Sequence, residues 1–178
     1  MTDTQTPPQI PVRLDFDHHA ADFSAAMSHL DRAATKQLDK VDFDHRLREL
    51  VRIRASQLNG CAYCIDMHTK DARAIGEAEQ RIYAVPAWRE TPFFTDRERA
   101  ALAWCEALTE LPSTGTPDEL YAAVEAEFSG EEIAALTFAI VAINGWNRLA
   151  VGLRSDVLSL DGLDLPGSTD PRARAEGA

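Results

Sequence analysis

The spacing of apolar positions predicts helices along nearly the whole chain. In residues 44–58, Leu47, Leu50 and Val51 recur at three- and four-residue intervals, which is the period of a helix buried on one face, and the alternation typical of a strand is absent. The same pattern predicts helices at about residues 18–38, 44–58, 61–75, 77–85, 95–111, 116–128 and 130–154. We therefore expect an all-α fold.

Local signals define several ends of these helices. Asn59-Gly60 is a helix stop, because both residue types tolerate the left-handed conformation, and Pro86 ends the helix at 77–85. The helix at 130–154 is apolar over most of its length, so we expect it to be the buried spine of the fold. Three helices begin with an S/T-x-x-E capping box, formed by Thr95 with Glu98, Thr116 with Glu119 and Ser129 with Glu132.

The length and composition indicate one globular domain. A chain of 178 residues with 45% apolar residues is long enough to bury a hydrophobic core. We expect the helical domain to span residues 13–160, with its motif core at about 43–126. A loosely ordered Pro- and Thr-rich tail is expected at 1–12, and a flexible tail at 161–178.

The charge of the chain excludes some classes of partner. Acidic residues outnumber basic residues 29 to 18, for a formal charge of −11, whereas nucleic acids and anionic membranes are bound by basic surfaces. We find no secretory signal, and we expect no segment as long and apolar as a membrane span. The expected location is the cytoplasm, with no nucleic-acid or membrane partner.

The most distinctive chemistry lies in residues 59–68, NGCAYCIDMH. At spacings of three and four residues, Cys61, Cys64 and His68 lie on one face of a helix. An imidazole can take a thiol proton and then stabilise the thiolate, and a helix N-terminus favours an anion at Cys61. A sulfenic acid on one cysteine can be attacked by the other to close a disulfide. The motif therefore predicts thiol peroxidase chemistry.

A histidine that acts as a base needs an orienting partner, and Glu49 is the candidate. If the helices before and after Asn59-Gly60 form an antiparallel hairpin, Glu49 faces His68. The alternative is an ion pair on a solvated face with a neighbouring arginine (Arg48, Arg52 or Arg54).

These residues resemble the core of a known family. A glutamate, eleven intervening residues and C-x-x-C-x-x-x-H resemble the alkyl hydroperoxidase D and carboxymuconolactone decarboxylase family, on its peroxidase-like branch. Residues 144–150, NGWNRLA, also resemble this family, and the resemblance covers roughly residues 35–155. The four motif positions are Glu49, Cys61, Cys64 and His68.

The resemblance implies an all-helical homo-oligomer, a trimer or a dimer of trimers, that reduces small hydroperoxides. It implies that Cys64 attacks the peroxide, that Cys61 then closes the disulfide, and that Glu49 and His68 relay protons. A dithiol or thioredoxin-like reductant would restore the thiols, and we expect neither a cofactor nor a metal. Tyr63 departs from well-studied peroxidase members, which have a histidine there, because a phenol with a pKa of about 10 is no base near neutral pH.

Several alternatives stay open. Two cysteines and a histidine can be part of a zinc site, but the chain has no second C-x-x-C or histidine pair, and a C-x-x-C can be purely structural. A third cysteine, Cys105, is expected to be a small buried apolar residue. The alternative functions are a carboxymuconolactone-decarboxylase-like catabolic enzyme, whose relatives typically lack the cysteine pair, and a non-catalytic redox-sensing module.

Overall fold

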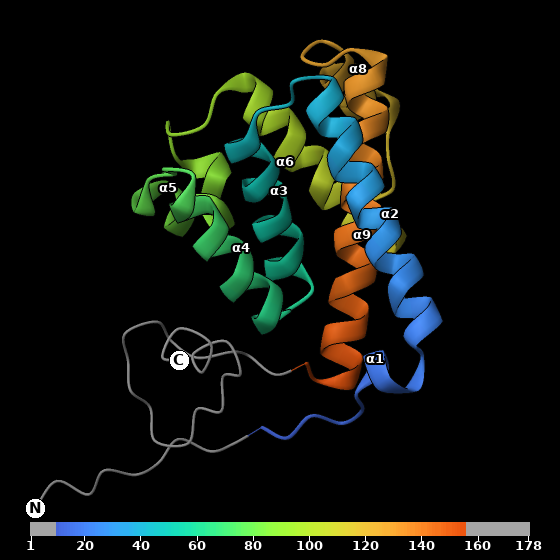
Figure 1. The fold of residues 1–178 in the computed structure, drawn as a ribbon. Helices are drawn as coiled ribbons and strands as arrows, with labels where there is room; N and C mark the ends of the chain where they lie inside the picture. The colour runs from blue at the N-terminus through green and yellow to red at the C-terminus, as the bar shows by residue number, and fades with distance from the viewer. Residues whose placement is uncertain (1–9, 156–178) are drawn as a thin grey trace, which may run out of the picture.

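The computed structural model describes residues 10–155, and within this range all regular elements are helices (Figure 1). The all-α prediction is confirmed. The tails predicted at 1–12 and 161–178 lie mostly or wholly outside the described residues. The elements are α1 (Phe16–His19), α2 (Ala21–Lys40), α3 (His45–Leu58), α4 (Ala62–Ala74), α5 (Glu79–Ala84), the 3₁₀ helix η1 (Val85–Glu90), α6 (Asp96–Thr109), α7 (Leu111–Thr114), α8 (Asp118–Glu125) and α9 (Gly130–Leu153).

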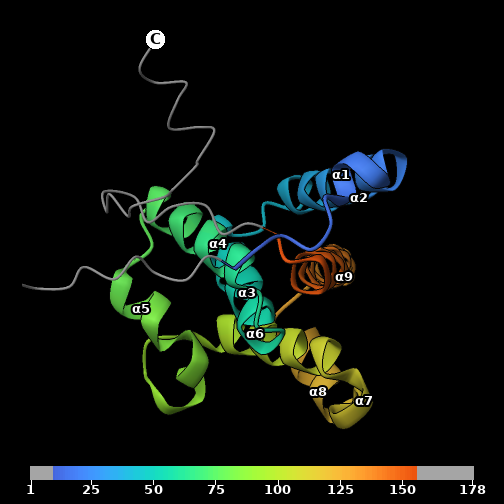
Figure 2. The ribbon, with the colours of Figure 1, turned by 90° about the horizontal axis from the view of Figure 1, so that it is seen from below.

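Helix α3 is the centre of the arrangement. It packs against α4, α6 and α9, which surround it in Figure 2, while the long helices α2 and α9 lie side by side (Figure 1). Leu47 and Val51 of α3 enter a core shared with α2, α6 and α9, whereas Leu50 and Ile53 enter a second core with η1 and α6. Burial of each such side chain stabilises the fold by about 1.5–3 kcal/mol. Helix α3 is thus held on two faces, which makes it a rigid base for site residues.

The predicted helix starts are correct where a side chain can cap the helix. Thr95 and Ser129 each form a complete capping box, at the starts of α6 and α9. The capping box predicted at Thr116 is wrong, because Pro117 is itself extended (ψ 150°) and is the N-cap of α8. Thr116 therefore lies one residue too early to cap the helix.

Three local features were not predicted. The helix expected at 18–38 is divided into α1 and α2 at Ala20, whose backbone (φ −142°, ψ 45°) is not helical. Helix α5 ends at Ala84, before Pro86, but the chain continues as η1 because proline is tolerated in a first helical turn. The short helix α7 has no apolar periodicity that would mark it.

Helix α9 is only partly the buried spine that its sequence predicted. Ile140 is fully buried, but Phe138 and Val141 on another face are 57% and 51% exposed. The expectation that no segment is as long and apolar as a membrane span is wrong for α9, although half of its apolar window is buried inside the protein. Its packing against α2, α3 and α6 is that of a core helix, with one apolar face left uncovered.

The turn between α3 and α4 offers a test of the fold by glycine substitution. Gly60 has φ +66°, and a Cβ there would contact nothing within 4 Å, so replacement by alanine adds only backbone strain. We expect Gly60→Ala to lower the free energy of unfolding by about 1–2 kcal/mol, measured by denaturant titration.

Gly130→Ala is the matched control. Gly130 is the first residue of α9, and a Cβ there also contacts nothing within 4 Å. Without a positive φ to oppose it, this change should raise the free energy of unfolding by about 0.4–1 kcal/mol. Equal effects of the two substitutions would contradict the strained turn.

Candidate active site

The turn at Asn59-Gly60 delivers Cys61 directly to the start of α4. The Gly60 N–H donates to the Gln57 carbonyl (3.2 Å) and the Cys61 N–H to the Ser56 carbonyl (2.9 Å), which is a Schellman motif. Cys61 is therefore both the residue that closes α3 and the N-cap of α4. Its sulfur accepts a hydrogen bond from the Cys64 backbone N–H at 3.4 Å.

The two sulfurs of the motif are adjacent and buried. Cys61 Sγ and Cys64 Sγ lie 2.6 Å apart, and the residues are 1% and 2% exposed. Both are free thiols in this structure. A disulfide bond is about 2.05 Å long, so the pair can be bridged by a small closing movement.

The two thiols are electrostatically unequal: once the pair has lost its first proton, the sulfurs share the one that remains. Once Cys61 has lost its proton, the Cys64 thiol can donate to it across 2.6 Å. This hydrogen bond and the one from the Cys64 backbone N–H overcome burial and lower the pKa of Cys61 to about 7. The same hydrogen bond, together with burial, raises the pKa of Cys64. The pair therefore loses its first proton near neutral pH, and the resting negative charge lies on Cys61.

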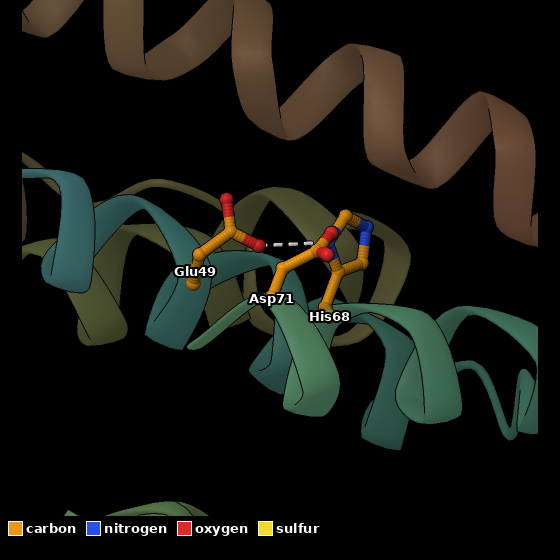
Figure 3. Close-up of side chains that lie close together, drawn as sticks. All are labelled: Glu49, His68 and Asp71. Atoms are coloured by element: carbon orange, nitrogen blue, oxygen red, sulfur yellow. Dashed lines mark hydrogen bonds and ion pairs between the residues drawn. The ribbon is translucent and has the colours of Figure 1, made fainter. Parts of the chain in front are cut away.

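Glu49 lies where the predicted hairpin would place it. In Figure 3 it points from α3 toward His68 on α4, and its Oε2 lies 2.8 Å from His68 Nδ1. Burial alone would raise the pKa of the Glu49 carboxyl, but the hydrogen bond with His68 and the charge of Arg52 lower it below its ordinary value. Glu49 is 5% exposed, so the interpretation as an acid on a solvated face is wrong.

Arg52, one of the three arginines considered as an ion-pair partner of Glu49, forms that pair inside the protein and not on a solvated face. Its Nη1 donates to Glu49 Oε1 at 2.9 Å and its Nη2 to Thr35 Oγ1 of α2 at 3.0 Å. Placed one turn after Glu49 on α3, it neutralises the buried carboxylate and links α3 to α2.

A metal would compete with this arrangement of charges. Glu49, His68 and the exposed Asp71 have donor atoms within 4.8 Å of one another (Figure 3). The Glu49 carboxylate already has Arg52 at 2.9 Å and Arg48 at 3.8 Å, and these positive charges oppose a bound cation. We therefore assign these residues to a hydrogen-bonded cluster.

A cavity of about 820 Å³ opens onto the motif. Cys64, His68 and Arg52 line it, whereas Cys61 is not part of the lining. Tyr63 also lines the cavity. It occupies the position at which the family resemblance implied a histidine. A reactant in the cavity therefore meets Cys64, with Cys61 behind it.

The opposite wall comes from distant parts of the chain. Ile143 and Trp146 of α9 line it together with Leu14 and Phe16 from the N-terminal segment. This segment is held to the end of α9, where the Leu14 N–H donates to the Leu153 carbonyl at 3.3 Å and the Phe16 ring contacts Trp146. Of these residues, only Trp146 lies in a segment that the sequence singled out, residues 144–150; no local motif marks Leu14, Phe16 or Ile143.

Cys105 is a core residue, as predicted. It is fully buried, its thiol donates to the Val51 carbonyl at 3.4 Å, and burial raises its pKa to about 12. It does not line the cavity. Among residues 10–155, Cys61, Cys64 and His68 do not converge with a fourth donor as a zinc site requires.

Comparison with known proteins agrees with the helical fold. Residues 21–107 match the model of the Carboxymuconolactone decarboxylase family. An Agrobacterium tumefaciens protein of unknown function, suggested to be the antioxidant defence protein AhpD, has a crystal structure that is similar at a TM-score of 0.79 and 39% identity, covering 84% of this chain and 100% of that one. The chain therefore belongs to the carboxymuconolactone decarboxylase family.

Two further relatives are uncharacterized, and one more solved structure shares the fold alone. The uncharacterized protein YdfG of Bacillus subtilis is 50% identical over 106 residues, which are 60% of this chain and 72% of YdfG. The uncharacterized protein YnjA of Escherichia coli is 32% identical over 94 residues, which are 53% of this chain and 51% of YnjA. The debrominase Bmp8 shares the fold at 19% identity and a TM-score of 0.68, covering 80% of this chain and 74% of Bmp8.

The shared proton leads to a prediction about pH. We expect thiolate absorbance in the ultraviolet to rise by one thiolate per chain with a midpoint at a pH of about 7, the pKa of Cys61. In Cys61→Ser, the cysteine with the lowered pKa is gone and the remaining Cys64 thiol is buried, so the midpoint should move to higher pH than in the wild type. A wild-type protein with no thiolate signal until the pH of an ordinary cysteine would contradict the shared proton.

Proposed function

We propose that the protein is a cytoplasmic, thiol-dependent reductase of hydroperoxides that uses the Cys61–Cys64 pair. The observation that carries the proposal is the placement of the dithiol: two sulfurs 2.6 Å apart, one of which lines a cavity beside His68. His68 is in turn held by a buried glutamate at 2.8 Å. Family membership supports a peroxidase-like role.

In the proposed reaction, the Cys64 thiolate attacks one peroxide oxygen and the O–O bond breaks. The other oxygen leaves as an alcohol after it takes a proton, and Cys64 becomes a sulfenic acid. The Cys61 thiolate then attacks the Cys64 sulfur, the S–S bond forms and water leaves with one further proton. The dithiol loses two electrons and the peroxide gains them. A dithiol or thioredoxin-like protein returns the electrons by thiol–disulfide exchange.

Cys64 is the attacking residue because of access, although the resting charge lies on Cys61. Attack requires that the shared proton leave Cys64, either for Cys61 across 2.6 Å or for His68. Glu49 stays ionised because its pKa is lowered, so it stabilises the imidazolium that forms when His68 takes a proton. The same imidazolium can then protonate the departing alkoxide.

The cavity suits a substrate larger than hydrogen peroxide. Its volume is about 820 Å³, and apolar side chains such as Leu14, Ile143 and Trp146 form much of its wall. An apolar wall of this size favours an organic hydroperoxide, whose alkyl group leaves water on binding.

Two other functions are weaker on the same observations. A decarboxylase has no evident use for two thiols held in bonding reach, although the family includes such enzymes. A redox-sensing module would use the disulfide without a substrate, but it has no need of a cavity lined by one of the two cysteines.

We further propose that the chain forms a closed homo-oligomer, a trimer or a dimer of trimers. Phe138 and Val141 of α9 and Phe23 of α2 are 57%, 51% and 80% exposed. The helices α2 and α9 lie side by side, and apolar side chains of this size are normally covered in a soluble protein. Light scattering should report a multiple of the 19.6 kDa chain. A monomer mass for both the reduced and the oxidised protein would contradict this.

The enzymatic proposal is tested by steady-state consumption of an organic hydroperoxide with a dithiol reductant. We expect Cys64→Ser to abolish turnover and the first reaction with peroxide. Cys61→Ser should react once and stop at a sulfenic acid on Cys64, detected by a trapping reagent and peptide mapping. A sulfenic acid trapped on Cys61 of the wild type, with Cys64 untouched, would reverse the two roles.

The relay is tested in the same assay with Glu49→Gln. We expect the rate to fall by about 10²–10⁴-fold near neutral pH, because the amide cannot stabilise a charged His68. Glu77→Gln is the matched control: Glu77 is also a buried carboxylate with an arginine at 2.9 Å, but it does not line the cavity. A full rate for Glu49→Gln, or an equal loss in both variants, would remove Glu49 from the mechanism.

A further inference from the structure

Part of the cavity wall comes from a segment that precedes the long helices. Val12, Leu14 and Phe16, at alternate positions of this segment, all line the cavity. Val12 and Leu14 are 46% and 41% exposed, and among the described residues neither belongs to the two hydrophobic cores. Their apolar surface is therefore available to a molecule that enters the cavity.

The C-terminal end of α9 holds this segment in place. The last carbonyl groups of a helix have no partner within the helix. The Arg13 and Leu14 backbone N–H groups donate to the Leu153 carbonyl, at 2.9 and 3.3 Å. Arg13 Nη1 also donates to the Gly152 carbonyl at 3.1 Å. The segment is thus anchored through its backbone and through Arg13, and the side chains of Val12 and Leu14 take no part in these hydrogen bonds.

Helix α9 continues the apolar wall. Ile143, Trp146 and Ala150 line the cavity, and their spacings of three and four residues place them on one face of the helix. The Phe16 ring contacts Trp146, with the ring centroids 6.4 Å apart, so the segment and α9 meet there. A hydrocarbon chain along this wall would leave water against both α9 and the N-terminal segment.

The charged groups of the cavity favour a neutral occupant. Three aspartates and two arginines line it: Asp15, Asp17, Asp31, Arg32 and Arg52. Arg52 and His68 are already paired with Glu49, at 2.9 and 2.8 Å. A carboxylate in the cavity would therefore meet an excess of negative charge, and it would also lose its hydration.

We propose that residues 12–16 are the specificity-determining segment of this site. In this arrangement, Val12 and Leu14 contact the hydrocarbon chain of a neutral organic hydroperoxide whose O–O group lies at Cys64. The inference rests on the proposed function and deepens it, because it assigns substrate selection to a segment outside the cysteine motif. Hydrogen peroxide has no hydrocarbon chain, so it gains nothing from this segment.

The test measures the dissociation constant of 1-octanol, the alcohol product of octyl hydroperoxide, by NMR titration of the reduced protein. We expect Leu14→Ala to weaken binding by about tenfold, because each CH₂ group that is no longer buried lowers an affinity by roughly fourfold. Val12→Ala removes less apolar surface and should have a smaller effect in the same direction.

Leu111→Ala is the matched control. Leu111 of α7 is 50% exposed, comparable with Leu14, but it does not line the cavity. Its replacement should leave the affinity for 1-octanol close to that of the wild type. Circular dichroism and thermal unfolding establish that each variant is folded. A wild-type affinity in a folded Leu14→Ala protein, or an equal loss in Leu111→Ala, overturns the proposal.

Octanoate, an anion of the same chain length, tests the charge of the occupant. We expect the wild type to bind octanoate about tenfold or more weakly than 1-octanol, because the aspartates of the cavity repel it. Equal affinities for the two probes would overturn the assignment of a neutral substrate.

Binding of the alcohol needs no turnover, so this result is separate from that of the peroxidase assay. In that assay, Leu14→Ala should lower kcat/KM for octyl hydroperoxide by about the same factor as the affinity and leave the rate with hydrogen peroxide unchanged. Binding of 1-octanol through Leu14 in a protein that consumes no hydroperoxide would support the segment as a ligand-binding element and defeat the proposed function. Turnover of octyl hydroperoxide at an unchanged kcat/KM in Leu14→Ala would do the reverse.

Discussion

The packing of α3 against α4 across the Asn59-Gly60 turn is the constraint on which the rest of the site depends. The turn closes one helix with a Schellman motif and begins the next at Cys61, so both thiols lie at a helix N-terminus. The antiparallel path then brings Glu49 to within 2.8 Å of His68. Burial of α3 in two cores, on opposite sides, keeps these positions rigid enough for proton transfer.

A rigid site inside the protein contains polar groups, and each of these groups needs a hydrogen-bond partner within the fold. Glu49 is stable inside the protein because Arg52 and His68 neutralise it, and the two hydrogens of the partly buried Asn59 amide are divided among the acceptors of Ala55, Asn144 and Asn147. Each hydrogen bond offsets the loss of hydration of the groups that form it. A buried group that lost its partner would destabilise the fold by about 1–3 kcal/mol. The hydrogen bonds that stabilise the α3–α4 corner are thus the same ones that orient its reactive groups.

The sequence predicts the parts of the site that are local. The contact between Glu49 and His68 follows from helical period and one helix stop, and the dithiol follows from a spacing of three residues. The wall formed by α9 and the N-terminal segment does not follow, because it depends on packing between segments such as those of Ser56 and Asn147, 91 residues apart. The capping box predicted at Thr116 is wrong because the backbone of Pro117 is extended, which makes Pro117 the N-cap of α8.

The negative charge of the pair lies on one cysteine, Cys61, whereas the other cysteine, Cys64, lines the cavity. The N-cap position and the Cys64 thiol stabilise negative charge on Cys61, while Cys64 is the one of the two that lines the cavity. A reactive thiolate that faced the cavity permanently would be open to oxidation by any small oxidant. In the proposed reaction, the charge on the sheltered sulfur lies one proton transfer, across 2.6 Å, from the sulfur that lines the cavity beside His68. That transfer is therefore the step that would make the cavity-facing sulfur reactive.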